Sequence, residues 1–511
     1  MNSSEIHKLC RSVQERFDVG RFVLDGVGVW PAVRFYFYTK VADSRQRRYM
    51  YLYQKKSHSS VFAAEQADTE QPGVKSLTRE QRDRSEEELS LIRDETVPDV
   101  LLFNTQKAPE QSPDFLIFQL FQDYRAEVGG GIYDKYLDPM VSLFGDRYRF
   151  QKLCRMTPEA VFKNYTFSPT FYALQESAMI TGPVYKDQDA FLKTILDFND
   201  VVLRYDPKLF LDPFFIIERV RKILNRARLL QPLIEHYSPK AVFFQSFPNV
   251  EKMPLTLACK RVGVPSIDVQ HGYLDSSQIY NDYLELKPDR FDLMPCKIWC
   301  WGDLTTETLR AQYPAGSGPD FNVGGYLWDE IYAREFPEVV ENKEKGILFI
   351  HQPDLVAQHR DGGLLPEHLV EAVKNLPKDV EFMIRMHPRS LHLVDDVEAQ
   401  LVELGLDAFD VRNASLDDLE IVLARTSKLL TSWSTVAFEA NAQGIPVGII
   451  DDVGEDIFKT YVERGWFYPC VDSETLSEFL ESESLIVPEI PYFASDPVEK
   501  TARLLQNLLK D

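Results

Sequence analysis

The stretches VEFMIRMHPR (380–389) and LLTSWSTVAFEANAQG (429–444) decide the fold of the C-terminal half of this chain. Each starts with an apolar run typical of a buried β-strand and ends in polar groups, HPR in the first stretch and SWST in the second. Strands of an open α/β sheet bring their carboxyl ends together. The helix after SWST begins with N–H groups and a partial positive charge that attract anions. The two stretches therefore predict a site for the phosphates of a nucleotide.

The alternation of strands and helices extends well beyond these two stretches. AVFFQSF (241–247) and SIDVQHG (266–272) are predicted strands separated by a helical segment, and a long helix is predicted within 210–237. The alternation restarts near residue 340. Strands and helices that alternate with short connections favour parallel sheets covered by helices on both faces. We therefore expect an α/β protein with two Rossmann-like domains.

Length and composition suggest where these domains begin and end, because 511 residues exceed what one compact core supports. The predicted division is an N-terminal extension with a polar linker (1–95), an N-terminal Rossmann-like domain (96–335) and a C-terminal Rossmann-like domain (336–511). Residues 57–95 are polar and charged and have little to bury, which is typical of an exposed connection. PDVLLFNTQ (98–106) is the predicted first strand.

Charge and cysteine content exclude several classes of protein. The net charge of −22 and the pI of about 5.0 argue against a general nucleic-acid binder, whose surface is basic. Of the six cysteines only Cys296 and Cys300 are close in sequence, and no second pair completes a zinc site, so we expect reduced thiols and no metal. The N-terminus has no apolar signal region, and no apolar stretch is long enough to span a bilayer. These features predict a cytoplasmic protein.

The segment from Arg34 to Lys56 is rich in basic and aromatic residues, unlike the acidic remainder. Two interpretations are open. Its cations and the aromatic run FYFY (35–38) suit peripheral contact with the anionic inner face of a cytoplasmic membrane. Alternatively, it is an ordinary helix packed on the first domain with its basic face in water.

A set of residues in the C-terminal half is predicted to bind the nucleotide. His387 precedes a proline, which extends the backbone, so the imidazole can reach a phosphate oxygen and, if protonated, stabilise a departing phosphate. Ser434 and Thr435 offer hydroxyls beside the helix N-terminus, although a serine there is often only a cap. Glu439 lies one helical turn further and suits a ribose diol. The full set is Gln352, Arg385, His387, Arg389, Ser432, Ser434, Thr435 and Glu439.

In the N-terminal half, SIDVQHGYLD (266–275) carries the candidate catalytic base. Histidine titrates near neutral pH, so His271 at a strand end can take the proton of a hydroxyl group. Asp275 is a rival base, and a histidine that only forms hydrogen bonds within its loop is the alternative. GGGIYDKY (129–136) is a possible flexible loop on the acceptor side. The further acceptor-side candidates are Gln270, Gly272, Gln245 and Asp134.

QHG in the N-terminal half, with HPR, SWSTxxxE and GIPV in the C-terminal half, resembles the GT-B glycosyltransferases of bacterial surface polysaccharide (capsule and O-antigen) assembly. The most similar patterns are those of enzymes that use CMP-activated Kdo or sialic acid. The resemblance implies two Rossmann-like domains facing across a cleft. It further implies that His387, Ser434 and Thr435 bind the nucleotide phosphate, that Glu439 binds the ribose and that His271 lines the reaction centre.

The chain departs from this family at the end of the strand before QHG. Retaining β-Kdo enzymes of this kind use an aspartate nucleophile, expected near the position where this chain has Gln245. Covalent catalysis and an inverting, base-assisted displacement therefore both stay open. The related glycerol-phosphate polymer transferases also carry an HG and an HP and use a CDP-activated donor. The motifs thus suggest a nucleotide donor more firmly than they specify the transferred group.

The resemblance implies a glycosyltransferase that moves a sugar, such as Kdo or another acidic sugar, from a nucleotide-activated donor to a surface-polysaccharide or lipid-linked glycan. The donor is expected to be CMP-linked, with no further cofactor. Three alternatives remain: a CDP-alditol transferase of the glycerol-phosphate type, a UDP-sugar 2-epimerase built on the same two-domain scaffold, and a non-catalytic protein that retains the fold.

Overall fold

The computed structural model packs into two compact units. The residues that it describes are 3–45, 93–97, 100–104, 112–123, 126–157, 160, 163–174, 185–274, 280, 283, 286–335, 346–352, 365–377, 380–406, 408–482, 484–488 and 490–510. The N-terminal unit comprises Leu9–Val41, Ser76–Glu335 and Pro491–Asp511. The C-terminal unit comprises Phe336–Ile490 together with Met1–Lys8 and Ala42–Lys75. Each unit has its own sheet.

The C-terminal unit is built on a parallel sheet. The described strands are β14 (Gly346–His351), β15 (Phe382–Met386), β16 (Phe409–Asp410), β17 (Thr426–Thr431), β18 (Val447–Ile449) and β19 (Tyr468–Pro469). Their order is β16-β15-β14-β17-β18-β19, and every neighbouring pair is parallel. The chain lays β15 and β16 on one side of β14 and then returns to lay the other strands on the opposite side. This is the doubly wound Rossmann order, and it reverses between β14 and β17.

Helices pack against this sheet and bury its apolar strands. They are α14 (Glu367–Lys374), α15 (Val394–Glu403), α16 (Arg412–Leu416), α17 (Leu419–Ala424), α18 (Val436–Ala442), α19 (Asp452–Ile457), α20 (Lys459–Glu463) and α21 (Ser473–Glu481). Strand β14 is buried along its whole length, as a central strand of a parallel sheet should be. Leu369, Val397 and Leu401 pack with Phe349 and Ile384 in the core of the unit. Each fully buried side chain of this size stabilises the fold by roughly 1.5–3 kcal/mol.

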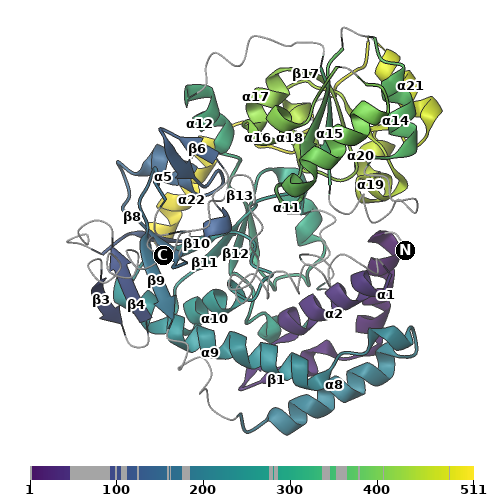
Figure 1. Ribbon diagram of the computed structural model, residues 1–511. Coiled ribbons are helices and arrows are strands. Elements are labelled where there is room, and N and C mark those ends of the chain that lie inside the picture. Colours follow the sequence, from purple (N-terminus) through teal and green to yellow (C-terminus); the bar gives the residue numbers. More distant parts are fainter. Residues whose placement is uncertain are drawn as a thin grey trace, which may run out of the picture. The chain divides into compact units, whose positions relative to one another are not determined.

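The N-terminal unit contains a longer sheet of the same kind (Figure 1). Its strands are β3 (Arg93–Val97), β4 (Val100–Asn104), β5 (Phe115–Gln119), β8 (Phe150–Arg155), β9 (Thr170–Leu174), β10 (Ala241–Phe244), β11 (Ser266–Val269), β12 (Lys297–Cys300) and β13 (Asp320–Val323). The order is β13-β12-β11-β10-β5-β8-β9-β4-β3. All pairs from β13 to β9 are parallel, and the order reverses between β5 and β10.

The helices and hairpins of this unit frame that sheet. They are α1 (Ser3–Arg16, which starts in residues assigned to the other unit), β1 (Val23–Leu24), β2 (Val27–Gly28), α2 (Trp30–Arg45), β6 (Ala126–Val128), β7 (Gly131–Tyr133), α5 (Asp138–Phe144), α8 (Gln188–Val202), α9 (Pro213–Tyr237), α10 (Met253–Val262), α11 (Asp303–Arg310), α12 (Trp328–Glu335) and α22 (Pro497–Lys510). Helix α9 is the predicted long helix. Asp212 caps it by accepting the Phe214 N–H, and it ends at Ser238 in a left-handed conformation.

The two sheets confirm the prediction of an α/β protein with two Rossmann-like domains. The strand predicted within 98–106 is present as β4, but β3 precedes it. Residues 100–104 form β4, which pairs antiparallel with β9 and with β3 near the edge of the sheet. The parallel sheet starts instead at β5, whose sequence FLIFQ is completely buried between β8 and β10. That apolar run is the sequence signal of a central strand.

The C-terminal helix α22 packs within the N-terminal unit, which differs from the predicted division at residue 336. Leu505 and Leu508 join the core that contains Phe115, Phe243 and Trp299, and they are almost completely buried. The Thr501 hydroxyl donates to the carbonyl of Gly324. The apolar positions of α22 recur at helical spacing, so one face of this helix can close the core of a sheet formed much earlier in the chain.

Leu9–Val41 also belong to this unit rather than to a separate extension. Phe22 stacks on Trp30 with ring centroids 5.2 Å apart, and Phe37 meets Phe198 of α8 edge-on at 5.2 Å. The guanidinium of Arg34 is buried over the ring of Tyr283 at 4.5 Å. Part of the aromatic run FYFY (35–38), which one interpretation placed at a membrane surface, is therefore buried in the core of this unit. The remainder of that segment (46–56) and residues 57–92 of the predicted linker lie outside the described residues.

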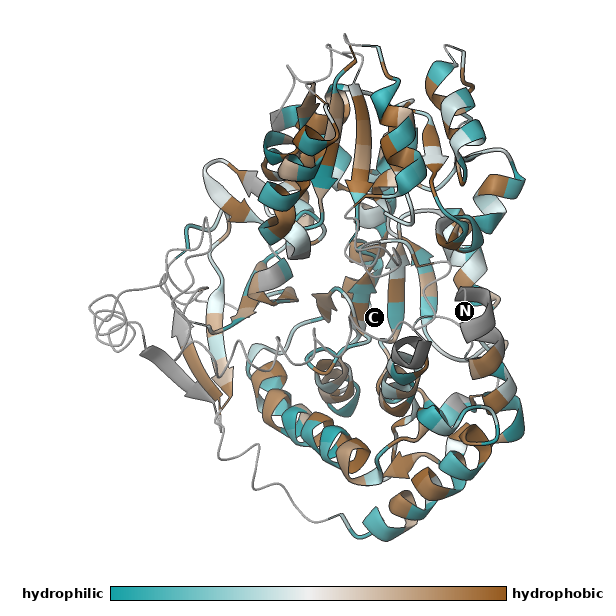
Figure 2. Ribbon diagram, turned by 45° about the vertical axis from the view of Figure 1, so that its right-hand side comes forward, coloured by the Kyte–Doolittle hydropathy of each residue, from teal (hydrophilic) through white to brown (hydrophobic). Residues whose placement is uncertain are grey.

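Apolar residues concentrate on the strands of both sheets, while the surrounding helices carry mixed faces (Figure 2). None of the helices in the described ranges is both long enough and apolar enough to cross a membrane. All six cysteines are free thiols.

Candidate functional site

The carboxyl ends of β14 and β17 meet where the strand order of the C-terminal sheet reverses. Gln352 follows β14, and the turn Ser432–Thr435 follows β17. The Oε1 atom of Gln352 accepts a hydrogen bond of 2.8 Å from the backbone N–H of Trp433, so one side chain links the two strand ends. Open α/β sheets bind their ligands at this switch point. Gln352, a predicted site residue, therefore lies at the position that the fold favours for a nucleotide.

The turn after β17 is held by its own hydrogen bonds. The Ser434 N–H donates to the Thr431 hydroxyl at 3.2 Å, and the Val436 N–H donates to the Ser434 hydroxyl at 3.3 Å. Helix α18 has only seven residues. The expectation that unpaired amides at this helix N-terminus hold a phosphate is therefore wrong for the amides of Trp433, Ser434 and Val436. Partly exposed Ser434 and Thr435 side chains remain as the polar surface of the turn.

Ser432 is completely buried, in contrast to the surface role predicted for it. Its carbonyl oxygen faces Gly454, where an added Cβ would collide with it, so the first turn of α19 packs directly on the end of β17. Asp451 caps that helix by accepting the Gly454 N–H at 2.6 Å. Burial raises the pKa of Asp451, and the neighbouring Ser432 hydroxyl opposes this effect. Asp451, at the end of β18, was not predicted, although it follows the apolar run PVGII directly.

His387 stands at the end of β15, as predicted. Its backbone N–H donates to the carbonyl of His351 at 3.2 Å, and its own carbonyl accepts the Ser390 N–H at 2.7 Å. The imidazole is partly exposed, whereas His351 at the end of β14 is completely buried. The side chain of the predicted phosphate ligand Arg389 lies outside the described residues. His387 thus flanks Gln352 on one side and the turn after β17 flanks it on the other.

Arg385 has a different role from the predicted phosphate ligand. Its Nη1 donates to the carbonyls of Ala414 and Asp417, both at 2.7 Å, and so ties down the end of α16. Burial lowers the pKa of Arg385, while the carboxylates of Glu420 and Glu439 act in the opposite direction. A guanidinium engaged with carbonyls and surrounded by acidic groups is poorly suited to phosphate. Glu439 itself is partly exposed on α18.

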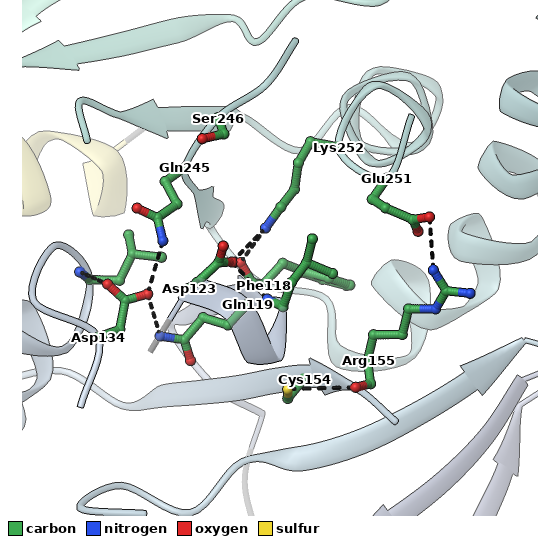
Figure 3. A network of polar contacts seen from close by, with 12 residues as sticks. Phe118, Gln119, Asp123, Asp134, Cys154, Arg155, Gln245, Ser246, Glu251 and Lys252 are labelled. Atoms are coloured by element: carbon green, nitrogen blue, oxygen red, sulfur yellow. Dashed lines mark hydrogen bonds and ion pairs between the residues drawn. The ribbon is translucent and has the colours of Figure 1, made fainter. Parts of the chain in front are cut away.

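The switch point of the N-terminal sheet is occupied by a buried amide–carboxylate network (Figure 3). Gln119 ends β5 and Gln245 follows β10, and both donate from Nε2 to Oδ2 of Asp134, at 2.9 and 3.4 Å. The other carboxylate oxygen of Asp134 accepts the backbone N–H groups of Tyr136 and Leu137 at 2.9 and 3.1 Å. This carboxylate therefore anchors three separate chain segments at one point.

Asp134 is fully buried, so its predicted place on a flexible acceptor loop is wrong. The exposed tip of that hairpin is Gly129–Gly130, and Asp134 lies at its base. Burial, reinforced by the carboxylate of Asp138, raises the pKa of Asp134 to about 7. Asp138 in turn pairs with buried Lys152 at 2.7 Å. The network has a structural role, because it holds the ends of β5 and β10 to the segment that follows β7.

Lys252 and Glu251 form three further ion pairs beside this network, of which only the Lys252–Asp123 pair is fully buried (Figure 3). The Lys252 ammonium donates to the Phe118 carbonyl at 3.1 Å and to Asp123 at 3.3 Å. Glu251 pairs with Arg226 at 2.6 Å and with Arg155 at 2.8 Å. These contacts fix the segment 245–252, which connects β10 to α10.

His271 is the chemically versatile group at this end of the N-terminal sheet. It follows β11 by two residues, is partly exposed, and its Nε2 lies 2.8 Å from the hydroxyl oxygen of Ser246 beyond β10. The ring of Tyr136 meets the imidazole edge-on with centroids 6.4 Å apart. Ser246 was not predicted as a site residue, and its only sequence signal is its place directly after an apolar strand.

The neighbours of His271 hold the chain in place. Gln270, predicted on the acceptor side, is buried; its Oε1 accepts the Trp301 N–H at 2.7 Å, and its Nε2 donates to the Gly272 carbonyl at 2.9 Å and the Tyr492 hydroxyl at 3.0 Å. Gln270 therefore positions the turn after β11 and is not exposed to a substrate. The rival base Asp275 lies outside the described residues.

Asp268 has a structural role at the end of β11. It accepts hydrogen bonds from the Tyr280 hydroxyl at 2.7 Å and the Phe247 N–H at 3.4 Å. Burial raises its pKa to about 7. Among the residues that the structure describes, no three metal-ligating side chains gather at one point. A hollow of about 560 Å³ between α5, α12 and α22 is lined by none of the predicted site residues.

No family model and no curated protein sequence matches this chain. Solved structures do. MnaA of S. aureus with UDP is 13% identical over 78% of this chain and 98% of its own, with a TM-score of 0.45. For the UDP-GlcNAc 2-epimerase of Neisseria meningitidis bound to UDP-GlcNAc, the identity is 14%, the coverage 78% and 99%, and the TM-score 0.43. For the wall teichoic acid polymerase TagF with CDPG, the values are 11%, 78%, 84% and 0.38. At these identities and TM-scores the likeness carries no conclusion about the reaction of this chain.

Proposed function

We propose that this protein is a glycosyltransferase that moves a sugar from a nucleotide-activated donor to a hydroxyl of a surface-polysaccharide or lipid-linked glycan. One observation carries the proposal: each of the two Rossmann-like sheets places a histidine and a hydroxyl-bearing side chain at the strand ends beside its switch point. Ligands of open α/β sheets bind there. Two such positions in one chain can serve a donor and an acceptor.

The C-terminal unit binds the donor in this proposal. His387 at the end of β15 and the hydroxyls of Ser434 and Thr435 beyond β17 contact the phosphate, on either side of Gln352. Side chains carry this contact, because three amides of the turn already have partners within the protein. A protonated imidazole also stabilises the charge that develops as the nucleotide departs. Glu439 on α18 holds the ribose diol.

The N-terminal unit binds the acceptor, and His271 takes the proton from its hydroxyl group. The acceptor oxygen then attacks the anomeric carbon, the bond to the phosphate oxygen breaks, and the electron pair leaves with the nucleotide. Gln245 is buried and bonded to Asp134, so the end of β10 offers no carboxylate nucleophile. This favours direct, inverting displacement over a covalent intermediate.

The motif resemblance further suggests a CMP-linked donor that carries Kdo or another acidic sugar, with no metal or organic cofactor. A CDP-alditol transferase is the second candidate. His271 and His387 support it equally, because phosphoglycerol transfer also needs a base for the acceptor hydroxyl and a cation at the departing phosphate. A UDP-sugar 2-epimerase requires no acceptor, so an assay without acceptor distinguishes it from both transferases.

Donor screening by mass spectrometry tests this proposal. The protein is incubated with CMP-, CDP-, UDP- and GDP-linked compounds, with and without a mixture of glycan and lipid-linked acceptors. The proposal predicts release of free nucleotide together with an acceptor whose mass increases by one sugar. A mass increase of one phosphoalditol identifies the second candidate. Isomerisation of a UDP-sugar without acceptor, or no turnover with any donor, contradicts the glycosyltransferase proposal.

A further inference from the structure

Ser246 has an unusual backbone conformation for its position. Among the described residues, only Asp25, Ser238 and Ser246 are non-glycine residues with positive φ. Asp25 lies in the tight turn between β1 and β2, and Ser238 ends helix α9, where left-handed residues are common. Ser246, with φ of 62°, instead follows the buried central strand β10 at the switch point of the sheet. Residues held in sparsely populated conformations cluster at functional sites.

The surrounding chain holds Ser246 in this conformation from both sides. Its carbonyl accepts a hydrogen bond of 2.8 Å from the Asn249 side chain. The next N–H, of Phe247, donates to the buried carboxyl of Asp268 at 3.4 Å, and the Phe247 carbonyl accepts the Asn249 N–H at 2.7 Å. On the other side, Gln245 is tied to Asp134. The turn is therefore built to present the Ser246 side chain in one direction.

That direction leads to the imidazole of His271. The Ser246 hydroxyl oxygen lies 2.8 Å from His271 Nε2, which is well within hydrogen-bond distance, and both side chains are partly exposed. The edge-on ring of Tyr136 limits rotation of the imidazole. A hydroxyl group donates and accepts at once, so the same contact serves either protonation state of the nitrogen.

We propose that Ser246 is a proton relay for His271 in the transfer reaction, an inference that rests on the proposed function. The acceptor hydroxyl donates its proton to the Ser246 oxygen while Ser246 passes its own proton to His271 Nε2. The acceptor oxygen forms the new bond to the anomeric carbon, and the departing phosphate takes the electron pair of the broken bond. Ser246 ends with one proton, the one that came from the acceptor, and His271 holds the proton that Ser246 gave up.

Substitution of Ser246 by glycine and by alanine tests the relay. Glycine adopts positive φ without strain, so Ser246→Gly removes the hydroxyl and preserves the turn. Ser246→Ala removes the hydroxyl and keeps the strain. The matched control is Ser238→Ala, because Ser238 has φ of 46° and a local hydroxyl bond to the Glu235 carbonyl but no contact with His271. A rate change due to the release of backbone strain alone would follow Gly but not Ala.

Two readouts are needed for each variant. Nitrogen-15 spectra of histidine-labelled protein, with the His271 signals assigned by their loss in His271→Gln, report the Nε2 hydrogen bond without any substrate. Steady-state kinetics report kcat and the KM for the donor. We expect both Ser246 variants to change the His271 Nε2 resonance and to lower kcat at least tenfold with an unchanged donor KM. Ser238→Ala should change neither the resonance nor kcat.

Unaltered His271 resonances in Ser246→Gly overturn the inference, whatever the activity of the protein. Altered resonances with a wild-type kcat overturn the relay as well, since the hydrogen bond would then have no part in catalysis. Failure of the wild-type protein to transfer any sugar contradicts the proposed function and with it the relay, and the spectra then establish separately whether Ser246 positions His271.

Discussion

Gln352 and Trp433 are joined across the switch point of the C-terminal sheet, where the Gln352 Oε1 atom accepts the Trp433 N–H at 2.8 Å. The two residues follow β14 and β17, the strands between which the order of the sheet reverses. The bond fixes the turn that carries Ser434 and Thr435 relative to the strand beside His387. In the proposed function this bond shapes the donor site, although Gln352 does not have to touch the phosphate itself.

Substitution of Gln352 should separate stability from nucleotide binding. Gln352→Ala leaves the Trp433 N–H without its partner and should lower the free energy of unfolding by about 1–3 kcal/mol. Gln352→Glu keeps an acceptor oxygen but places a negative charge beside the proposed phosphate site. We expect this variant to unfold near the wild-type urea concentration and to bind nucleotide at least tenfold more weakly in calorimetry. Wild-type affinity in both variants would remove Gln352 from the donor site.

His387→Ala and Ser434→Ala should weaken nucleotide binding to different degrees. His387 can supply a charge-assisted hydrogen bond to the phosphate, so its loss should have the larger effect. Ser434→Ala should cost on the order of 1–2 kcal/mol of binding free energy for one hydrogen bond. Titration calorimetry with the nucleotide identified by donor screening measures both. Equal affinity of either variant and the wild-type protein contradicts its predicted contact.

Arg385 provides the matched control for these variants. Because its guanidinium bonds the carbonyls of Ala414 and Asp417, Arg385→Met should lower the free energy of unfolding by roughly 1–3 kcal/mol. At a temperature where this variant is still folded, its nucleotide affinity should equal that of the wild type. A selective loss of affinity without loss of stability would restore Arg385 as a phosphate ligand.

The buried carboxyl of Asp134 predicts a pH dependence of stability. Its pKa is raised from 3.8 to about 7, so the folded protein retains a proton that the unfolded chain loses. This contribution is fully present below pH 3.8 and is lost as the pH rises to about 7. Each pKa unit corresponds to about 1.4 kcal/mol. Asp268, whose pKa is also raised to about 7, contributes with the same sign.

Urea unfolding between pH 5 and pH 8 measures this effect; these limits reach from about two pKa units below the raised values to about one unit above them. The wild-type protein should lose stability as the pH rises. Asp134→Asn retains an oxygen for the Tyr136 and Leu137 N–H groups but does not ionise, so its stability should fall less steeply. The same slope in the variant and the wild type would show that Asp134 does not titrate in this range.

Gly454 should be intolerant of a side chain. A Cβ at this position would collide with the Ser432 carbonyl, so Gly454→Ala must displace α19 from the end of β17 and should cost about 1–3 kcal/mol of stability. Asp452→Ala, an exposed change in the same helical turn, should cost less than about 0.5 kcal/mol. Thermal unfolding of the two variants compares them directly. If the two variants were equally stable, α19 would shift away from the Ser432 carbonyl at little cost, and the prediction would be wrong.

The sequence predicts the parts of this fold in which local pattern and global position agree. Buried parallel strands are continuous apolar runs, so β14, β15 and β17 and their polar ends are recognisable. The strand β4 also has an apolar sequence, but whether it pairs in parallel or antiparallel depends on β9, about seventy residues further along the chain. Long-range pairing of this kind leaves no trace in a local window. The packing of α22 on the N-terminal sheet also depends on residues far away in the sequence, so a local window does not predict it.

Candidate site residues are harder to predict, because polar side chains at strand ends serve structure as often as chemistry. Asp134, Gln270 and Arg385 have the right residue types at the right places, yet Asp134 and Gln270 are buried and all three side chains are bonded to backbone groups. Burial and these backbone partners depend on the packing of distant segments, so the sequence alone does not reveal them. Ser246 was missed for the opposite reason, since only its backbone conformation and its distance from His271 mark it.

A crystal structure of the protein soaked with CMP tests the central claim most directly. The proposal predicts density for the nucleotide at the ends of β14, β15 and β17, with its phosphate within hydrogen-bond distance of the Ser434 hydroxyl and the His387 imidazole. Density for the nucleotide at another place, or an unchanged switch point at a CMP concentration that saturates binding in solution, would contradict it.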